Sequence, residues 1–177
     1  MALYAIFTRE GLEETLKNEI EERFIRPGEE VYILMVNRLK KYDGEYRIVA
    51  RCLFPGYIFI DTEDDECLST SLRRNREIRA LLYSSDPDEN VVALGKEEEK
   101  ILDRLCGKDH ILDISYGYKD EDGVHITTGP LVGVERIIKK VNRHKRIAVI
   151  EIDFLSKKKE LIVGLVIENG KETGSDT

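Results

Sequence analysis

Cationic side chains between Arg136 and Arg146 are the residues of this sequence best suited to binding a ligand. Two β-prone runs, Val134–Val141 and Ile147–Phe154, flank a polar turn that carries half of these Lys and Arg residues. Guanidinium and ammonium groups on a compact hairpin turn can contact the phosphates of a nucleic acid. The alternative is a solvated strand edge, where lysine commonly blocks edge-to-edge pairing. The candidate nucleic-acid contacts here are Lys139, Lys140, Arg143, His144, Lys145 and Arg146.

A second group of cations follows a run of hydroxyl side chains. The arginines at 73, 74, 76 and 79 come directly after Ser69-Thr70-Ser71. The whole chain is acidic, with 28 Lys and Arg against 35 Asp and Glu and a net charge of −7. This balance argues against a general nucleic-acid coat protein. A local basic patch can still bind phosphates, because salt limits the reach of each charge to about 10 Å.

The sequence carries none of the motifs on which an enzyme would depend. Its three histidines are scattered, and no HExxH, GxSxG or GxGxxG occurs. Its three cysteines form no CxxC pair, which fits a reducing cytoplasm. No apolar run approaches the roughly 18 residues that a membrane span needs. We therefore expect a cytoplasmic protein without catalytic residues, metal site, cofactor or membrane contact.

Hydrophobic periodicity predicts an α+β domain over residues 1–107. Apolar residues every four positions indicate a helix over Leu12–Phe24. Thr62 is a candidate cap for a second helix over Asp64–Arg74, and Gly95–Cys106 is predicted as a third. An Asp-Gly turn inside the loop 40–45 indicates a hairpin. The predicted strands, which imply an antiparallel sheet packed by helices, are Leu3–Thr8, Val31–Leu39, Tyr46–Leu53 and Tyr57–Asp61.

The helical period disappears in the last third of the chain. Residues 108–121 read as a polar linker and entry to the next domain, and residues 122–168 as a small β-barrel made of short strands divided by turns. The last residues, 169–177, lack apolar side chains and are predicted to be a flexible tail. The barrel strands are predicted at Val124–Thr127, Val134–Val141, Ile147–Phe154 and Glu160–Ile167.

Three segments resemble the NusG family of transcription elongation factors, and together they span residues 2–168. The strand from Leu3 to Gly11 with its following helix, and the segment Leu53-Phe54-Pro55-Gly56-Tyr57-Ile58-Phe59-Ile60, look like the NGN domain of that family. Residues 125–152, with a Gly129-Pro130 turn and Gly133 three residues later, resemble its KOW motif. The resemblance implies an NGN-like antiparallel sheet with packing helices, a C-terminal SH3-like KOW barrel, and a monomer.

The family resemblance also implies a partner, RNA polymerase. In the family, an aromatic-lined hollow of the NGN domain packs on the clamp helices of the largest polymerase subunit. The matching positions here are Tyr4, Phe7, Phe54 and Tyr57. Aromatic side chains often anchor interfaces. The alternative for Phe7 and Phe54 is that they are ordinary core residues.

Two further site predictions rest on the specialised paralog RfaH. Ser69, Thr70 and Ser71 fall where RfaH has a segment that touches the polymerase gate loop, although its histidine is Leu68 here. Arg76 and Arg9 fall on positions that contact the non-template DNA strand, and Arg73 and Arg74 adjoin the first of them. Closing the polymerase clamp would disfavour the pause-prone state and so favour elongation.

The basic barrel turn resembles the LoaP group of specialised paralogs. That resemblance implies a processive antiterminator that reads an RNA hairpin in a nascent leader transcript, since A-form RNA is read by shape and phosphates. The alternatives are a general NusG-type elongation and pausing factor and a ribosome-associated KOW protein. In the housekeeping family the barrel binds ribosomal protein S10 or Rho. Phe154 matches a contact there, whereas Ser156–Lys159 departs from the family's Phe-Gly-Arg pattern.

Overall fold

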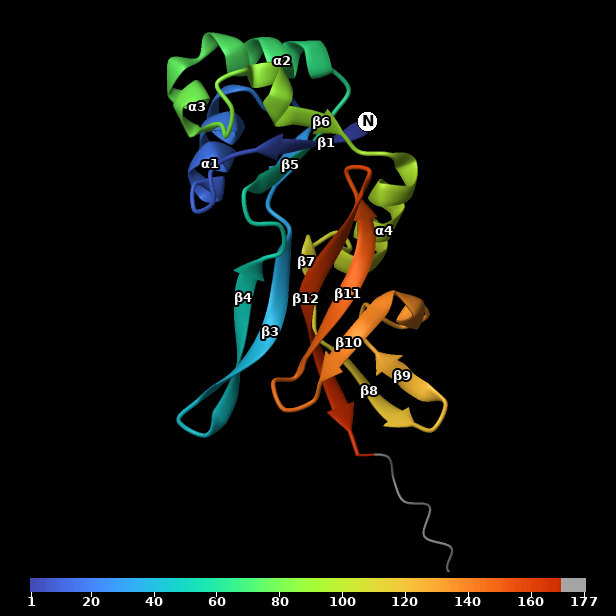
Figure 1. Ribbon diagram of the computed structural model, residues 1–177. Helices are drawn as coiled ribbons and strands as arrows, with labels where there is room; N and C mark the ends of the chain where they lie inside the picture. The colour runs from blue at the N-terminus through green and yellow to red at the C-terminus, as the bar shows by residue number, and fades with distance from the viewer. Residues whose placement is uncertain (170–177) are drawn as a thin grey trace, which may run out of the picture.

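The computed structural model describes residues 1–169, so the predicted tail beyond Asn169 lies outside the described residues. Figure 1 shows an elongated molecule with a helix-rich part at one end and a β-barrel at the other. The α+β fold class is confirmed. No helix among residues 1–169 is long and apolar enough to cross a membrane.

A four-stranded antiparallel sheet forms the centre of the N-terminal part. The residues of β1 and β5 alternate between two faces, as side chains along a strand must. Ile6 and Ile58 point to one core, whereas Ala5 and Phe59 point to another. The strands in spatial order are β2 (Glu30–Tyr32), β5 (Tyr57–Thr62), β1 (Ala2–Phe7) and β6 (Val91–Ala93).

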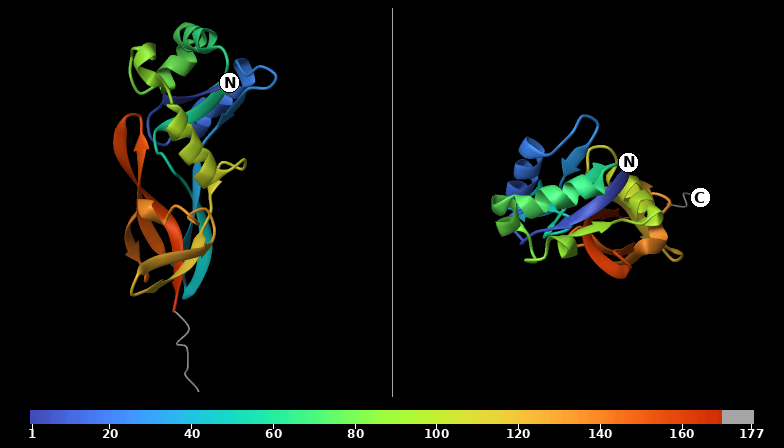
Figure 2. Two further views of the ribbon diagram at one scale, coloured as in Figure 1. Left: turned by 90° about the vertical axis from the view of Figure 1, so that its right-hand side faces the viewer. Right: turned by 90° about the horizontal axis from the view of Figure 1, so that it is seen from above.

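Three helices cover one face of this sheet, and a fourth packs toward the other. Leu16 of α1, Leu72 of α2 and Ile78 of α3 are fully buried in the same core as Ile6. Leu105 of α4 is buried in the second core, and α4 runs from the sheet down to the barrel (Figure 2, left). The helices are α1 (Glu13–Arg23), α2 (Asp65–Arg74), α3 (Arg76–Leu81) and α4 (Lys96–Cys106).

The predicted strand Val31–Leu39 is wrong as a single element. It divides into β2 and β3 (Met35–Tyr42), which belong to different sheets. Ile33 is buried in the helix-side core and Leu34 in the other core, so the chain changes layers between them. The predicted loop 40–45 is also too long, because β3 and β4 (Glu45–Cys52) pair up to Tyr42 and Glu45. Only the Asp-Gly turn remains.

The cap of α2 also differs from the prediction. The Asp64 carboxylate, rather than Thr62, accepts from the backbone N–H of Cys67 at 2.9 Å, whereas Thr62 Oγ1 accepts from the N–H of Asp64 at 3.1 Å. The Cys67 N–H, followed by the Arg26 guanidinium, lowers the pKa of Asp64. The helix α3, the 3₁₀ turn Pro87–Asn90 and β6 are too short to show a periodic pattern, and they were not predicted.

Five strands form the barrel at the other end. The segment predicted as a linker contains β7 (Ile111–Leu112), which pairs with β3, and β8, which belongs to the barrel. The predicted strand Val134–Val141 begins instead with a 3₁₀ turn, Glu135–Ile137. The strands in spatial order are β10 (Ile138–Asn142), β11 (Ile147–Phe154), β12 (Lys157–Glu168), β8 (Ser115–Asp120) and β9 (Gly123–Thr128).

Glu13 ties the start of α1 to the bend before β5. Its carboxylate is buried and accepts from the N–H of Gly11 at 2.8 Å and of Gly56 at 2.7 Å. A Glu13→Gln variant keeps the shape but points an amide NH₂ at one of these donors. We expect it to lower the free energy of unfolding by about 2–4 kcal/mol, measured by urea denaturation.

The exposed neighbour Glu14 provides the control for this prediction, since it also lies in the first turn of α1. Glu14→Gln should cost less than about 1 kcal/mol, the usual size of a helix-dipole interaction. Equal losses in the two variants would show that Glu13 acts through the helix dipole and not through the Gly11 and Gly56 amides.

Candidate functional site

Three of the predicted polymerase contacts lie together on one face of the N-terminal sheet. The ring centroids of Phe7 and Tyr57 are 4.9 Å apart, and those of Phe54 and Tyr57 are 6.4 Å apart. Phe54 is fully buried, whereas Phe7 and Tyr57 are half-buried. We call Phe7, Phe54 and Tyr57 the aromatic face.

Tyr4 does not belong to this group. It stands three residues before Phe7 on β1, so its side chain points to the opposite side of the sheet. There it packs against the core shared with α1, α2 and α3. Burial, followed by the charge of Asp65, raises the pKa of its phenol. Tyr4 and the aromatic face therefore cannot meet the same flat surface of a partner.

The tip of the β11–β12 hairpin covers the aromatic face. The ring centroid of Phe154, at the end of β11, lies 4.4 Å from that of Phe54 and 5.5 Å from that of Tyr57. Phe154 is only 4% exposed. The backbone N–H of Ser156, at the same tip, donates to Glu98 of α4 at 3.2 Å. One continuous core therefore runs from the sheet into the barrel.

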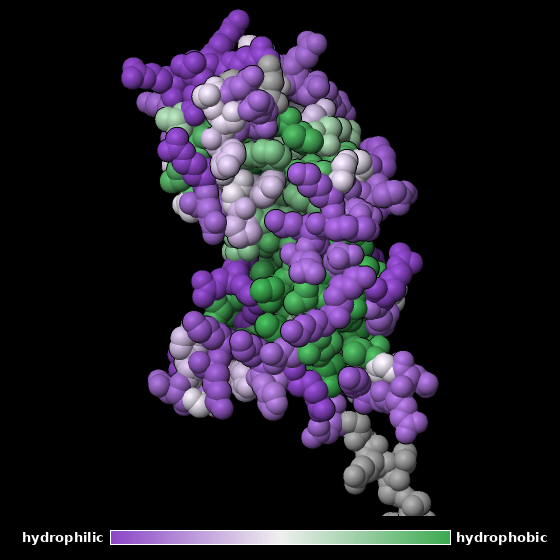
Figure 3. All heavy atoms as spheres, in the orientation of Figure 1, coloured by the Kyte–Doolittle hydropathy of each residue, from purple (hydrophilic) through white to green (hydrophobic). Residues whose placement is uncertain are grey.

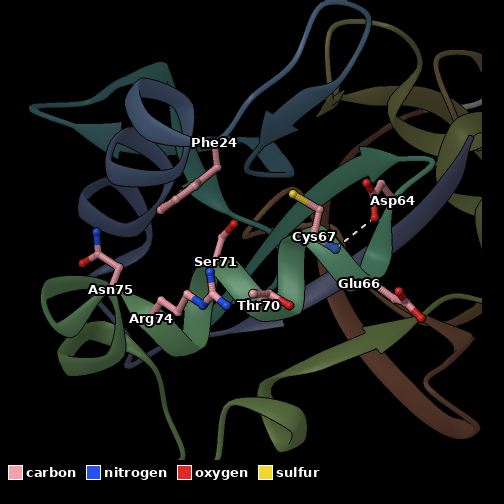
Figure 4. A pocket seen from close by; sticks show the side chains of 8 residues that line it. All are labelled: Phe24, Asp64, Glu66, Cys67, Thr70, Ser71, Arg74 and Asn75. Atoms are coloured by element: carbon pink, nitrogen blue, oxygen red, sulfur yellow. Dashed lines mark hydrogen bonds between the residues drawn. The ribbon is translucent and has the colours of Figure 1, made fainter.

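The hydroxyl residues predicted to touch the gate loop lie in the middle of α2. Thr70 is exposed, whereas Ser69 and Ser71 are half-buried. Thr70 and Ser71 line an open hollow of about 620 Å³ together with Arg74 and, across from them, Phe24 (Figure 4). Ser69 does not line it. The hollow thus joins two of the three hydroxyls to one predicted nucleic-acid contact.

The predicted DNA-binding arginines surround the end of α2 and the start of α3. Arg73, Arg74 and Arg76 are exposed. Arg9 is exposed as well, and its neighbour Thr8 donates a side-chain hydrogen bond to the carbonyl of Leu81 at 2.7 Å, at the end of α3. All four arginines therefore lie at the helix-rich end of the molecule.

The cations of the barrel turn lie far from those arginines, toward the opposite end of the molecule (Figure 1). Arg143, His144 and Lys145 are exposed on the turn between β10 and β11. Lys139 is separate, because it approaches Glu151 at 3.7 Å and lines a hollow beside α4. An irregularity in the β10–β11 pairing falls between Ile138 and Lys140. The structure therefore divides the predicted nucleic-acid contacts into at least two surfaces.

The barrel turn meets a basic hairpin that sequence reasoning missed. The guanidinium of Arg146 stacks on the ring of Tyr46 in β4, 3.7 Å from its centroid. The hydroxyl of Tyr46 donates to the carbonyl of His144 at 3.3 Å. Arg38, Lys40, Lys41 and Arg51 of β3 and β4 line the space between the hairpin and the turn. The available signal was the repeated cations in residues 38–51, which the prediction treated only as a hairpin.

The metal-ligating and thiol side chains of the described residues bear on whether the chain holds a metal site or a reactive cysteine. Among residues 1–169, no group of three or more His, Cys, Asp or Glu side chains could hold a metal ion. Cys106 is buried in the core and Cys52 and Cys67 are half-buried. Burial raises the pKa of the Cys106 thiol to about 12, which disfavours the reactive thiolate.

An antiparallel sheet covered by helices, followed by a small barrel with a basic turn, is the α+β arrangement that the resemblance to NGN and KOW domains implies. A family model described as "Transcription termination factor nusG" matches residues 1–103, more than half of the chain. The chain therefore belongs to the NusG family of transcription factors.

Among solved structures, one similar chain is NusG of Thermotoga maritima, from a structure titled "Domain interaction in Thermotoga maritima NusG". The two chains are 19% identical, and the match covers 92% of this chain and 93% of the other with a TM-score of 0.49. A search of curated proteins found no significant match.

Proposed function

We propose that this chain binds RNA polymerase during elongation and suppresses pausing and termination without any catalytic step of its own. Membership of the NusG family supports this proposal, and the observation that carries it is the aromatic face of Phe7, Phe54 and Tyr57. Its expected partner is the pair of clamp helices of the largest polymerase subunit. Half-buried aromatic rings that contact one another offer the apolar anchor that such an interface needs.

The barrel tip and the polymerase would compete for the same rings. Phe154 occupies the side of Phe54 and Tyr57 that a clamp helix would need. Binding of polymerase therefore requires the barrel to move off the aromatic face. The free energy of barrel docking reduces the apparent free energy of polymerase binding. This gives the chain a closed form that does not engage polymerase and an open form that does.

The helix-rich end provides two further proposed contacts. Ser69, Thr70 and Ser71 would face the polymerase gate loop, and bridging the two sides of the channel would hold the clamp closed. Arg9, Arg73, Arg74 and Arg76 would contact the exposed non-template DNA strand, since guanidinium groups bind phosphates and guanine edges. The exposure of these arginines supports the second contact.

The barrel turn supports the specialised, LoaP-like form of this function. Arg143, Lys145 and Arg146 gather where a nascent RNA hairpin could be contacted through its phosphates. The alternative is a general NusG-type factor without RNA specificity. Binding of S10 or Rho is disfavoured in the closed form, because Phe154 is buried against the N-terminal sheet.

A transcription assay on two templates tests the proposal. Purified polymerase transcribes a long operon either with its leader hairpin or with a scrambled leader, with and without the protein. Increased readthrough only on the hairpin template would support the specialised factor. Equal readthrough on both templates would favour the general factor, and absence of binding to polymerase would reject both.

Tyr57→Ala is expected to lower the affinity for polymerase at least thirtyfold, the effect of removing an interface anchor worth about 2 kcal/mol. Surface plasmon resonance with immobilised polymerase measures it. Tyr4→Ala is the matched control, since Tyr4 lies on the other face of the same sheet. Equal losses in both variants, together with equal losses of thermal stability, would mark Tyr57 as a core residue only.

A further inference from the structure

A basic groove lies between the two domains, at the end remote from the helices. Its volume is about 490 Å³. One wall is the β3–β4 hairpin with Arg38, Lys41 and Arg51, and the other is the barrel turn with His144 and Lys145. Leu39, Val49 and Ile147 add apolar surface. Figure 3 shows hydrophilic side chains over the hairpin next to apolar side chains over the barrel strands.

The cations of this groove have no anionic partner among residues 1–169. No ion pair involves Arg38, Lys40, Lys41, Arg51 or Lys145 there, although acidic residues outnumber basic ones in the whole chain. Burial, followed by the nearby charge of Arg51, lowers the pKa of Arg38. The groove therefore gathers uncompensated positive charge, which a bound polyanion would neutralise.

The aromatic ring of Tyr46 lies among these cationic side chains. Arg146 from the barrel stacks on Tyr46 of the hairpin, and Lys41 lies 5.8 Å from the same ring centroid. Tyr42, at the tip of the hairpin, is exposed and has Lys40 at 5.3 Å from its ring centroid. Grooves that track a phosphate backbone with cations and stack bases on aromatic rings are typical of single-strand binding.

We propose that this groove binds a single-stranded phosphodiester chain across both domains. The cations would contact successive phosphates, while Tyr42, Tyr46 or the guanidinium stacked on it would meet the bases. A cleft of this volume has the size of a small-ligand site and admits a few nucleotides of one strand. The unstacked bases of a single strand can reach the aromatic rings, whereas those of a duplex are already stacked on one another. An acidic peptide would neutralise the charge but would leave the stacking surfaces unused.

This groove adds the β3–β4 hairpin to the barrel turn as a nucleic-acid-binding surface. The inference rests on the proposed function in one respect, namely that the bound strand comes from a transcription complex. Since the walls of the groove come from different domains, it exists only in the closed form. A strand in the groove is therefore expected to hold the barrel on the N-terminal sheet.

Fluorescence anisotropy with the full-length chain tests the groove. The probes are a labelled 12-nucleotide RNA of mixed sequence and DNA of the same sequence, each titrated at several salt concentrations. We expect Lys41→Gln with Arg51→Gln to weaken binding at least tenfold and to reduce the salt slope by about 1.4, since each phosphate that a cation neutralises on a single strand adds about 0.7 to that slope. Tyr46→Leu should weaken binding about five- to 150-fold, because the bases can no longer stack on its ring.

The matched control is Lys108→Gln with Lys119→Gln, which removes two exposed cations that do not line the groove. An equal loss in this control would overturn the proposal, because binding would then follow net charge alone. Polyglutamate that displaces the RNA as well as unlabelled RNA does would overturn it too. Tighter binding of RNA than of DNA would indicate that the groove binds the transcript. Equal binding of RNA and DNA would indicate that it binds any exposed single strand. Both results support a single-strand groove.

A second pair separates the groove from the proposed function. Arg143→Gln with Lys145→Gln alters only the barrel turn. If this pair weakens binding while Lys41→Gln with Arg51→Gln does not, the hairpin wall plays no part and the groove is rejected, yet RNA contact by the barrel survives. Polymerase affinity, measured separately on the two pairs of cation variants, should be unchanged by those substitutions, so failure of the wild-type chain to bind polymerase would reject the function alone.

Discussion

Phe154→Ala is expected to release the barrel from the N-terminal sheet and to raise the affinity of the chain for RNA polymerase. The Phe154 ring stacks on Phe54 at 4.4 Å and contacts Tyr57 and Phe59 with ring centroids at 5.5 and 6.2 Å. Removing a buried phenylalanine ring costs about 3–5 kcal/mol. Most of this free energy should be lost from the docking of the barrel on the N-terminal sheet, because Phe54, Tyr57 and Phe59 all belong to the N-terminal part.

The gain in affinity follows from the closed and open forms. If only the open form binds polymerase, the apparent dissociation constant is the intrinsic one divided by the open fraction. Weakening the closed form by about 3 kcal/mol changes the ratio of the two forms roughly a hundredfold. The apparent affinity should therefore rise until the open form predominates. Titration of polymerase, with small-angle scattering to follow the radius of gyration, measures both effects.

Phe24→Ala is the matched truncation, since Phe24 packs on the other core beside α2. It should leave the radius of gyration unchanged, because Phe24 packs on the core of the helix-covered side of the sheet and not on the barrel. An open Phe154→Ala variant with wild-type affinity would show that polymerase does not use the aromatic face. A variant that stays closed would show that β12 and α4 hold the barrel without Phe154.

The elements with strong periodicity were predictable because local patterns decide them. The predicted helices over Leu12–Phe24 and Gly95–Cys106 and the predicted strand Ile147–Phe154 agree with α1, α4 and β11 of the structure. Gly107 adopts a φ of 60° directly after α4, the left-handed region that glycine enters at least cost. The family was predicted from motifs and is confirmed by the match over residues 1–103.

The grouping of the site residues depends on long-range register and could not be predicted. Tyr4 and Phe7 are both aromatic residues of one strand, but their spacing of three sends them to opposite faces. Lys139 and Lys140 adjoin an irregularity in the pairing of β10, which no local pattern indicates. Such features arise from tertiary packing and not from propensity.

Contacts between the N-terminal sheet or its hairpin and the barrel were even harder to predict from the sequence. Arg38 and Arg51 lie opposite the barrel turn only because the β3–β4 hairpin extends along the barrel (Figure 1). Phe154 resembles any apolar residue at the end of a strand until its stacking on Phe54 is known. The sequence therefore predicted which residue types could act, whereas docking decides which of them act together.

Gly164→Ala is expected to open the molecule from a second place, without touching the aromatic face. Gly164 lies on β12 where that strand passes β3. An added Cβ would stand 2.7 Å from the carbonyl oxygen of Asn37 and 2.9 Å from Cγ1 of Ile114. The first of these is backbone of the N-terminal domain and cannot rotate away. Overpacking of this kind costs about 1–3 kcal/mol.

The ratio of the closed form to the open form should therefore fall about five- to 150-fold, and the radius of gyration should rise as it does in Phe154→Ala. Single-strand binding should fall in parallel, because the groove needs both walls. Glu160→Ala changes an exposed position of the same strand and should leave both properties unchanged.

The two opening variants distinguish docking from contact with polymerase. Gly164→Ala keeps every aromatic side chain, so a rise in its polymerase affinity can come only from exposing the aromatic face. If Phe154→Ala raises polymerase affinity and an equally open Gly164→Ala does not, the effect of Phe154 lies in its own side chain and the competition between barrel and polymerase is rejected. Parallel rises, with parallel losses of strand binding, would mean that one docking equilibrium governs both surfaces.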